Sequence, residues 1–172
     1  MIVVLLGYMG CGKSTVGQIL AKKLELNFLD LDDYIEQKQQ ASISELFNSK
    51  GELFFRTLES QAVKYLCNHS DALVLALGGG TPCYSDTMQF LKEHSNVKTV
   101  FLNLSVKNLS ERLIYEKSKR PLIANLNDEA IPEFIAKHVF ERSFYYNQAE
   151  LIIQTDALSV DEIVATLHAK LI

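Results

Sequence analysis

The sequence has few cysteines, and they show no pattern that would hold a metal or a disulfide framework. Among its 172 residues there are three cysteines, Cys11, Cys67 and Cys83, and no C-x-x-C pair. Disulfide scaffolds and zinc modules use paired or regularly spaced cysteines, so both classes are disfavoured. We therefore expect reduced thiols and a cytoplasmic protein.

The chain also lacks an excess of basic charge and any long apolar run. Its 17 Lys and Arg against 21 Asp and Glu give a formal net charge of −4, whereas nucleic-acid-binding domains carry a basic face. No stretch approaches the ~18 consecutive apolar residues of a membrane-spanning helix. Residues 2–6 lack the basic n-region of a signal peptide. We expect neither nucleic acid nor a membrane as a partner.

The length of the chain bears on its number of domains, and the spacing of its histidines bears on metal binding. A length of 172 residues with 48% hydrophobic and 22% charged residues is ordinary for one globular domain, here 1–172. The histidines are not spaced as metal ligands and are expected on the surface: His69, His94, His138 and His168.

A phosphate-binding motif lies near the start of the chain, in the setting that it requires. The pattern G-x-x-x-x-G-K-[ST] is matched by Gly7-Tyr8-Met9-Gly10-Cys11-Gly12-Lys13-Ser14. An apolar run before it predicts a strand, and helical spacing after it predicts a helix. Backbone N–H groups of such a loop surround phosphate at a helix N-terminus. The motif predicts a nucleoside triphosphate, with Lys13 on its phosphates and Ser14 as a Mg²⁺ ligand; it does not identify the acceptor.

Apolar runs alternate with helical patterns along the rest of the chain. We expect strands at 2–6, 26–29, 72–77, 97–102 and 151–153, and helices at 14–24, 34–47 with a break near 41–42, 54–67, 86–91, 105–115, 129–146 and 160–171. Such alternation predicts an α/β fold whose parallel sheet is covered by helices on both faces. Ligands bind at the carboxyl ends of such strands, so the loops after the first three strands should converge on one cleft.

The loops after the second and third strands carry candidate site residues. Asp30 and Asp32 should point the same way along an extended stretch, one toward a metal and one toward an acceptor hydroxyl. The alternative is that Asp32 or Asp33 caps the next helix. The run Gly78-Gly79-Gly80 would let a ligand approach the backbone closely, or is a flexible turn.

Three arginines complete the candidates. Arg56 and Arg142 lie among aromatic residues and can present a planar fork to a carboxylate or phosphate. Their spacing alone favours surface ion pairs with Glu59 and Glu141. Arg120 lies in a charged loop at 116–121, which predicts either a lid over the γ-phosphate or a solvated linker.

Together these residues resemble the shikimate kinase family over almost the whole chain. Besides the P-loop, the matches are, in order, Asp30-Leu31-Asp32, Phe55-Arg56, Gly78-Gly79-Gly80, Arg120-Pro121-Leu122 and Arg142-Ser143-Phe144-Tyr145-Tyr146-Asn147-Gln148-Ala149. They favour ligand-binding roles for Arg56 and Arg142 over surface ion pairs. Leu31 and Leu77 stand where many members have serine or threonine, and neither change removes a named chemical group.

The resemblance implies a three-layer α/β/α P-loop kinase fold with a five-stranded parallel sheet in order 2-3-1-4-5. It implies a substrate-binding region at about 31–62 and a lid at about 113–127. The implied reaction moves the γ-phosphoryl group of ATP to the 3-hydroxyl of shikimate, with Mg²⁺, on the route to chorismate and aromatic amino acids. A monomer is the default expectation.

The resemblance also implies three sets of site residues. ATP would contact Gly10, Cys11, Gly12, Lys13, Ser14, Thr15, Arg112, Arg120 and Thr155, with Arg112 and Thr155 near the adenine; shikimate would contact Asp32, Arg56, Gly78, Gly79, Gly80 and Arg142; Mg²⁺ would lie at Ser14 and Asp30. The expected catalytic residues are Lys13, Asp32 and Arg120, with Asp32 as a candidate base. The alternatives are a kinase for another sugar acid such as gluconate, or a non-catalytic nucleotide-binding module.

Overall fold

Five parallel strands form one sheet in the computed structural model, which describes residues 1–120 and 122–172. The order is β2-β3-β1-β4-β5, as predicted, and the strands are β1 (Ile2–Leu6), β2 (Asn27–Asp30), β3 (Leu73–Ala76), β4 (Val97–Asn103) and β5 (Leu151–Gln154). The central strand β1 pairs with β3 on one side and β4 on the other. All five of its residues are apolar and buried, because helices cover both faces.

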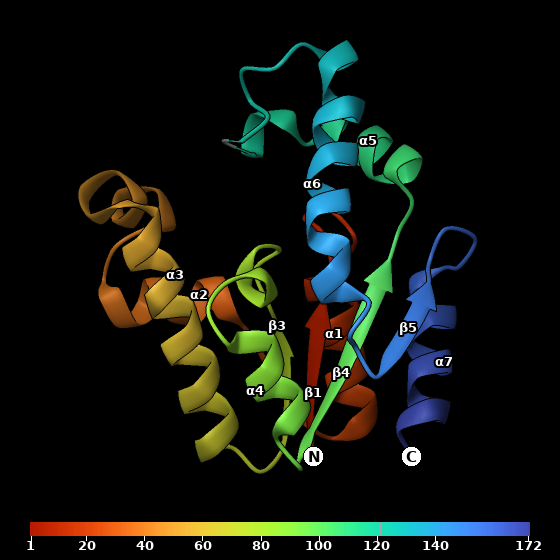
Figure 1. Ribbon diagram of the computed structural model, residues 1–172. Helices are drawn as coiled ribbons and strands as arrows, with labels where there is room; N and C mark the ends of the chain where they lie inside the picture. Colours follow the sequence, from red (N-terminus) through yellow and green to blue (C-terminus); the bar gives the residue numbers. More distant parts are fainter. Residues whose placement is uncertain (121) are drawn as a thin grey trace.

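Helices cover the sheet on two faces, which gives the predicted three layers (Figure 1). On one face lie α1 (Lys13–Leu24) and α7 (Val160–Leu171); on the other lie α3 (Ile43–His69) and α4 (Thr87–Glu93). Alternate residues of a strand point to opposite faces. Accordingly, Val3 belongs to the core cluster with α1, and Val4 belongs to the cluster with α3.

Two helices and their connection stand beyond the carboxyl ends of the strands (Figure 1). They are α5 (Val106–Tyr115) and α6 (Ile131–Tyr146), and both chain termini lie at the opposite end of the sheet. Within the described residues, no helix combines the length and the apolar character needed to cross a membrane.

The connection between α5 and α6 contains more helical structure than the sequence predicted. Short 3₁₀ helices form at η2 (Lys117–Lys119) and η3 (Asp128–Ala130), so the regular part of the predicted helix 129–146 starts at Ile131. Ile123 is fully buried in the core cluster, which anchors the connection. Pro121 of the predicted lid motif lies outside the described residues.

The helix after β2 begins earlier than predicted, which corrects two expectations. α2 (Leu31–Gln39) starts directly after the strand because Asp30 is its N-cap and accepts a hydrogen bond from the Asp32 amide. Asp30 and Asp32 therefore do not share an extended stretch. The capping alternative, which placed Asp32 or Asp33 at the cap, was also wrong by two or three residues.

The predicted break near 41–42 is present, whereas the predicted gap between the helices 34–47 and 54–67 is a kink inside α3. Ser42 and Glu45 form a capping box, in which the Glu45 carboxylate accepts a hydrogen bond from the Ser42 amide at 2.7 Å. At Gly51 the backbone has φ 82° and ψ 170°, a conformation open essentially only to glycine. The break at Gly51 is a kink within one long helix, so the helix that carries Arg56 changes direction just before it.

Candidate active site

The phosphate-binding loop joins β1 to α1, and the side chain of Lys13, the first residue of α1, folds back onto the loop. The Lys13 ammonium donates hydrogen bonds to the carbonyl oxygens of Gly7, at 2.9 Å, and Tyr8, at 3.0 Å. Gly12 is the N-cap residue of α1, and no side chain of the described residues caps this helix. The first amides of α1 are thus available to an anion, as the P-loop motif predicts.

Two oxygen-bearing side chains meet beside this loop. The Ser14 hydroxyl donates to one oxygen of Asp30 at 2.6 Å, while the other Asp30 oxygen accepts from the Asp32 amide at 3.1 Å. Paired hydroxyl and carboxylate oxygens suit Mg²⁺, which takes few protein ligands and completes its shell with phosphates and water. Among the described residues, no three His, Cys, Asp or Glu side chains gather as a metal cage. The donor set therefore fits a nucleotide-bound Mg²⁺.

Asp32 lies against the glycine run, the segment Gly78–Gly80. A Cβ atom added to Gly78 would lie 3.2 Å from an Asp32 carboxylate oxygen. Burial raises the pKa of Asp32 to about 6, with further contributions from the Asp30 and Glu59 carboxylates and an opposing one from Lys13. A carboxyl group with a pKa near neutrality is suited to proton transfer.

Arg56 approaches the glycine run from α3. A Cβ atom on Gly80 would lie 2.7 Å from its guanidinium, and the guanidinium also lies over the Tyr84 ring at 4.5 Å. Arg56 donates to Glu59 at 2.8 Å, so the predicted ion pair forms, but Glu59 is only 1% exposed. The other Glu59 oxygen accepts from the Thr81 hydroxyl at 2.6 Å. Glu59 thus links Arg56 to the segment after the glycine run; the i,i+3 spacing indicated the pair but not its burial.

Arg142 approaches the same run from α6. A Cβ atom on Gly79 would lie 3.4 Å from its guanidinium, which also lies 5.3 Å from the centre of the Tyr8 ring. In the part of the chain that the structure describes, Arg142 forms no salt bridge, so the expected pair with Glu141 is absent. The glycine run is thereby flanked by two arginines and one carboxylate.

Three other predicted nucleotide contacts lie in different settings. Arg112 donates to the Gly10 carbonyl at 3.3 Å, so it lies beside the P-loop. Arg120 pairs with Glu116 at 2.9 Å. Thr155 is buried, and its hydroxyl donates to the Asn103 carbonyl at 3.1 Å. The partners of Arg120 and Thr155, Glu116 and Asn103, are therefore not residues of the P-loop.

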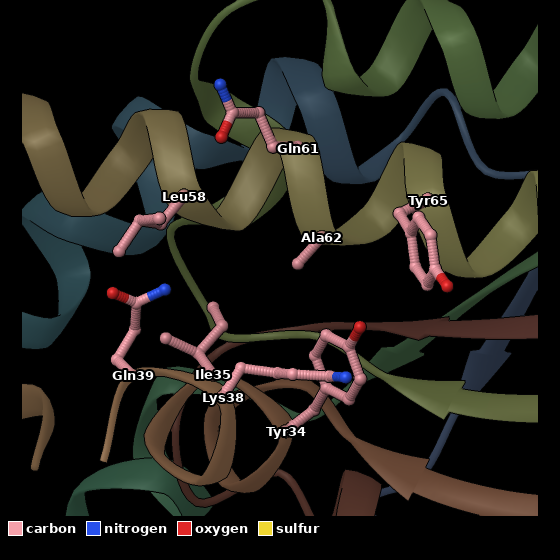
Figure 2. Close-up of a pocket in the computed structure, with 8 residues that line it drawn as sticks. All are labelled: Tyr34, Ile35, Lys38, Gln39, Leu58, Gln61, Ala62 and Tyr65. Atoms are coloured by element: carbon pink, nitrogen blue, oxygen red, sulfur yellow. The ribbon is translucent and has the colours of Figure 1, made fainter. Parts of the chain in front are cut away.

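A separate groove of about 210 Å³ lies between α2 and α3 (Figure 2). Its lining includes Tyr34, Lys38, Leu58 and Tyr65, and none of the predicted site residues. This groove is a product of helix packing, whereas the predicted site residues gather where three strands end. The candidate active site is therefore identified by its polar and charged side chains and not by the volume of a cavity.

Comparison with known proteins identifies the family of this chain. The family model for shikimate kinase matches residues 9–172. The chain belongs to the shikimate kinase family. It is 48% identical to a shikimate kinase of Flavobacterium johnsoniae over 162 residues, 94% of each chain. The family consists of ATP-dependent kinases, and the P-loop of this chain has the parts that such a reaction requires.

Two solved structures are similar over nearly their whole length. A shikimate kinase from Bacteroides thetaiotaomicron has a TM-score of 0.91 at 35% identity, covering 99% of this chain and 98% of the other. A shikimate kinase from Acinetobacter baumannii in complex with shikimate has a TM-score of 0.87 at 32% identity, covering 99% and 92%.

Proposed function

We propose that the chain transfers the γ-phosphoryl group of ATP to the 3-hydroxyl of shikimate, giving ADP and shikimate 3-phosphate for aromatic amino acid biosynthesis. The observation that carries this proposal is the group around the glycine run: Arg56, Arg142 and Asp32 beside the P-loop Lys13. Two guanidinium groups suit a carboxylate, and one carboxylate suits a hydroxyl. A small polyhydroxy acid such as shikimate presents both groups.

The nucleotide half of the site holds and neutralises the phosphates. Lys13 and the first amides of α1 bind the β- and γ-phosphates, with Gly10, Cys11, Gly12 and Thr15 forming the rest of the loop contact. Ser14 and Asp30 would hold Mg²⁺, which supplies positive charge to the phosphate oxygens. Arg112 beside the loop and Arg120 of the lid region 113–127 add further cationic contacts, and Thr155 flanks the adenine.

The acceptor half of the site orients one hydroxyl toward the phosphate. Arg56, Arg142 and the glycine run hold the carboxylate of shikimate, and most of this half comes from region 31–62. Asp32 accepts a hydrogen bond, and then the proton, from the attacking hydroxyl. Because phosphoryl transfer depends mainly on positioning and charge neutralisation, these contacts are sufficient for the reaction.

The remaining proposals concern the whole protein. We propose a monomeric, cytoplasmic enzyme whose single kinase domain spans 1–172. A cytoplasmic setting is supported by three free cysteines, of which Cys11 and Cys67 are buried.

The function is tested by ADP release from MgATP in the presence of shikimate, gluconate, AMP or CMP. Turnover with shikimate alone supports the proposal. Turnover with another acceptor would leave the phosphate site intact and overturn the roles of Arg56 and Arg142. Folded protein that binds ATP and is inactive with all four would favour a non-catalytic nucleotide-binding module.

A further inference from the structure

One face of α6 contacts both halves of the site. His138, Arg142 and Tyr146 are spaced four residues apart, so their side chains follow one another along that face. His138 shares a 3.2 Å hydrogen bond with the Tyr8 hydroxyl of the P-loop, and Arg142 lies against Gly79. The Tyr146 hydroxyl donates to the Gly79 carbonyl at 2.5 Å. The helix that carries an acceptor-binding arginine is thus also bonded to the glycine run.

The Tyr146 side chain is fixed by packing, and its hydroxyl stays protonated and so remains a hydrogen-bond donor. Its side chain is 1% exposed, and its ring packs on Phe101 of β4 with the ring centres 5.0 Å apart. Burial is the largest effect on the pKa of Tyr146 and raises it above the usual value, so the hydroxyl keeps its proton at neutral pH. The bond to Gly79 is part-buried, so losing the Tyr146 donor would leave the Gly79 carbonyl with less hydrogen bonding than it has in the fold, at a cost in free energy.

The Tyr146 bond adds a side-chain restraint to the glycine run, whose own turn is closed by a hydrogen bond from the Thr81 amide to the Gly78 carbonyl at 3.1 Å. Three consecutive glycines lack the side chains that normally restrict a turn. In a trans peptide the C=O and N–H groups point in opposite directions. Holding the Gly79 carbonyl toward α6 therefore also sets the direction of the Gly80 N–H. Gly80 itself lies against Arg56, since a Cβ atom there would be 2.7 Å from the guanidinium.

We propose that Tyr146 is a positioning residue for the acceptor carboxylate. Its hydroxyl fixes the Gly79–Gly80 peptide plane, and its helix carries Arg142 one turn earlier. The Gly80 amide and the Arg142 guanidinium therefore keep one fixed spacing, at which both would meet the carboxylate of the acceptor. This inference rests on the proposed function, because it assigns the acceptor site to Arg142 and the glycine run.

The test compares Tyr146→Phe with Tyr145→Phe and the unchanged protein in steady-state kinetics. Tyr145 is a matched control because it is the adjacent tyrosine, and its hydroxyl has no hydrogen-bond partner among the described residues. We expect Tyr146→Phe to raise the KM for shikimate about tenfold, equivalent to about 1.4 kcal/mol, and to leave the KM for ATP within about twofold. Tyr145→Phe should change neither. Because KM does not depend on the concentration of active enzyme, partial unfolding of a variant would not mimic this result.

Three results separate failure of this inference from failure of the function that it rests on. If the unchanged protein phosphorylates shikimate and Tyr146→Phe keeps its KM for shikimate, the inference is overturned and the function stands. An equal rise in both KM values would also overturn it, since that pattern indicates general loosening of the fold. If the unchanged protein neither binds nor phosphorylates shikimate, the proposed function is overturned and the inference with it.

Discussion

At the scale of single residues, the raised pKa of Asp32 bears both on its proposed chemical role and on the stability of the fold. Its pKa is raised to about 6 by burial first, and then by the carboxylates of Asp30 and Glu59. A tenfold change in an acid dissociation constant corresponds to about 1.36 kcal/mol, so the ionised form of Asp32 costs the fold at most about 3 kcal/mol. The environment that suits Asp32 to the proposed role of base therefore also destabilises the protein above pH 6.

Replacing Asp32 with asparagine should separate these two effects. We expect the Asp32→Asn variant to lose about 100-fold or more in kcat, since general base catalysis contributes that much. Between about pH 4 and pH 6 the folded state holds a proton that the unfolded state has lost, so this group makes stability fall as pH rises through that window. The variant should lack that decline. Denaturant unfolding at pH 4.5 and pH 8, together with kcat, measures both effects.

The neighbouring Asp33→Asn variant is the matched control for Asp32→Asn, because Asp33 is exposed and lies outside the predicted contacts. Its kcat should stay near that of the unchanged protein. A normal kcat in Asp32→Asn would remove Asp32 from the catalytic centre.

Arg142 should contribute to the binding of shikimate and not to the binding of ATP. Loss of a hydrogen bond to a charged group costs ~1.5–3 kcal/mol, so Arg142→Ala should raise the KM for shikimate by roughly 10-fold to more than 100-fold. The KM for ATP should change far less. Lys137→Ala, an exposed change on the same helix, is the control. Equal effects of Arg142→Ala on both substrates would contradict its assignment to the acceptor.

At the scale of elements, the strands and the phosphate loop could be predicted because their signals are local. The apolar run 2–6 and the adjacent glycine motif are contiguous in the sequence. The start of α2 was missed because a strand residue, Asp30, is also the helix cap, and no periodicity marks that double role. The bond from Tyr146 to Gly79 joins positions 67 residues apart and depends on how α6 crosses the sheet edge. Such contacts follow from the topology rather than from spacing.

Asp30 is both the N-cap of α2 and a proposed Mg²⁺ ligand, and a cap variant can test whether it has both roles. The Asp30→Ala change removes the N-cap of α2 and should cost about 0.5–2 kcal/mol in the free energy of unfolding. It also removes the partner of Ser14, so we expect more Mg²⁺ to be needed for half-maximal turnover. Denaturant unfolding and Mg²⁺ titration of the rate measure the two effects.

Ser159→Ala provides the control for Asp30→Ala, because it removes the cap of α7, which carries none of the predicted site residues. It should lose a similar amount of stability and keep its Mg²⁺ dependence. The same Mg²⁺ requirement in both variants would show that Asp30 is a structural cap only.

At the scale of the whole molecule, a chain of net charge −4 gathers cationic groups at one edge of its sheet. Lys13 and Arg112 lie at the P-loop, while Arg56 and Arg142 flank the glycine run. These groups make up the two neighbouring anion sites that we propose, one for ATP and one for shikimate. A ligand that binds the folded state stabilises it by RT ln(1 + [L]/Kd). Each site can therefore be assessed through the stability of the entire fold.

The two sites should respond independently in thermal unfolding. At a ligand concentration of 100 Kd the stabilisation is about 2.7 kcal/mol, which raises Tm by roughly 5–10 °C for a chain of this size. We expect shikimate to raise Tm in the unchanged protein and in Lys13→Ala, and to have little effect in Arg142→Ala. MgATP should raise Tm in the unchanged protein and in Arg142→Ala, and should have little effect in Lys13→Ala. Because the chain contains no tryptophan, circular dichroism is the appropriate probe. If one variant abolished both shifts, the two sites would form a single binding unit, and the separate roles of Lys13 and Arg142 would be wrong.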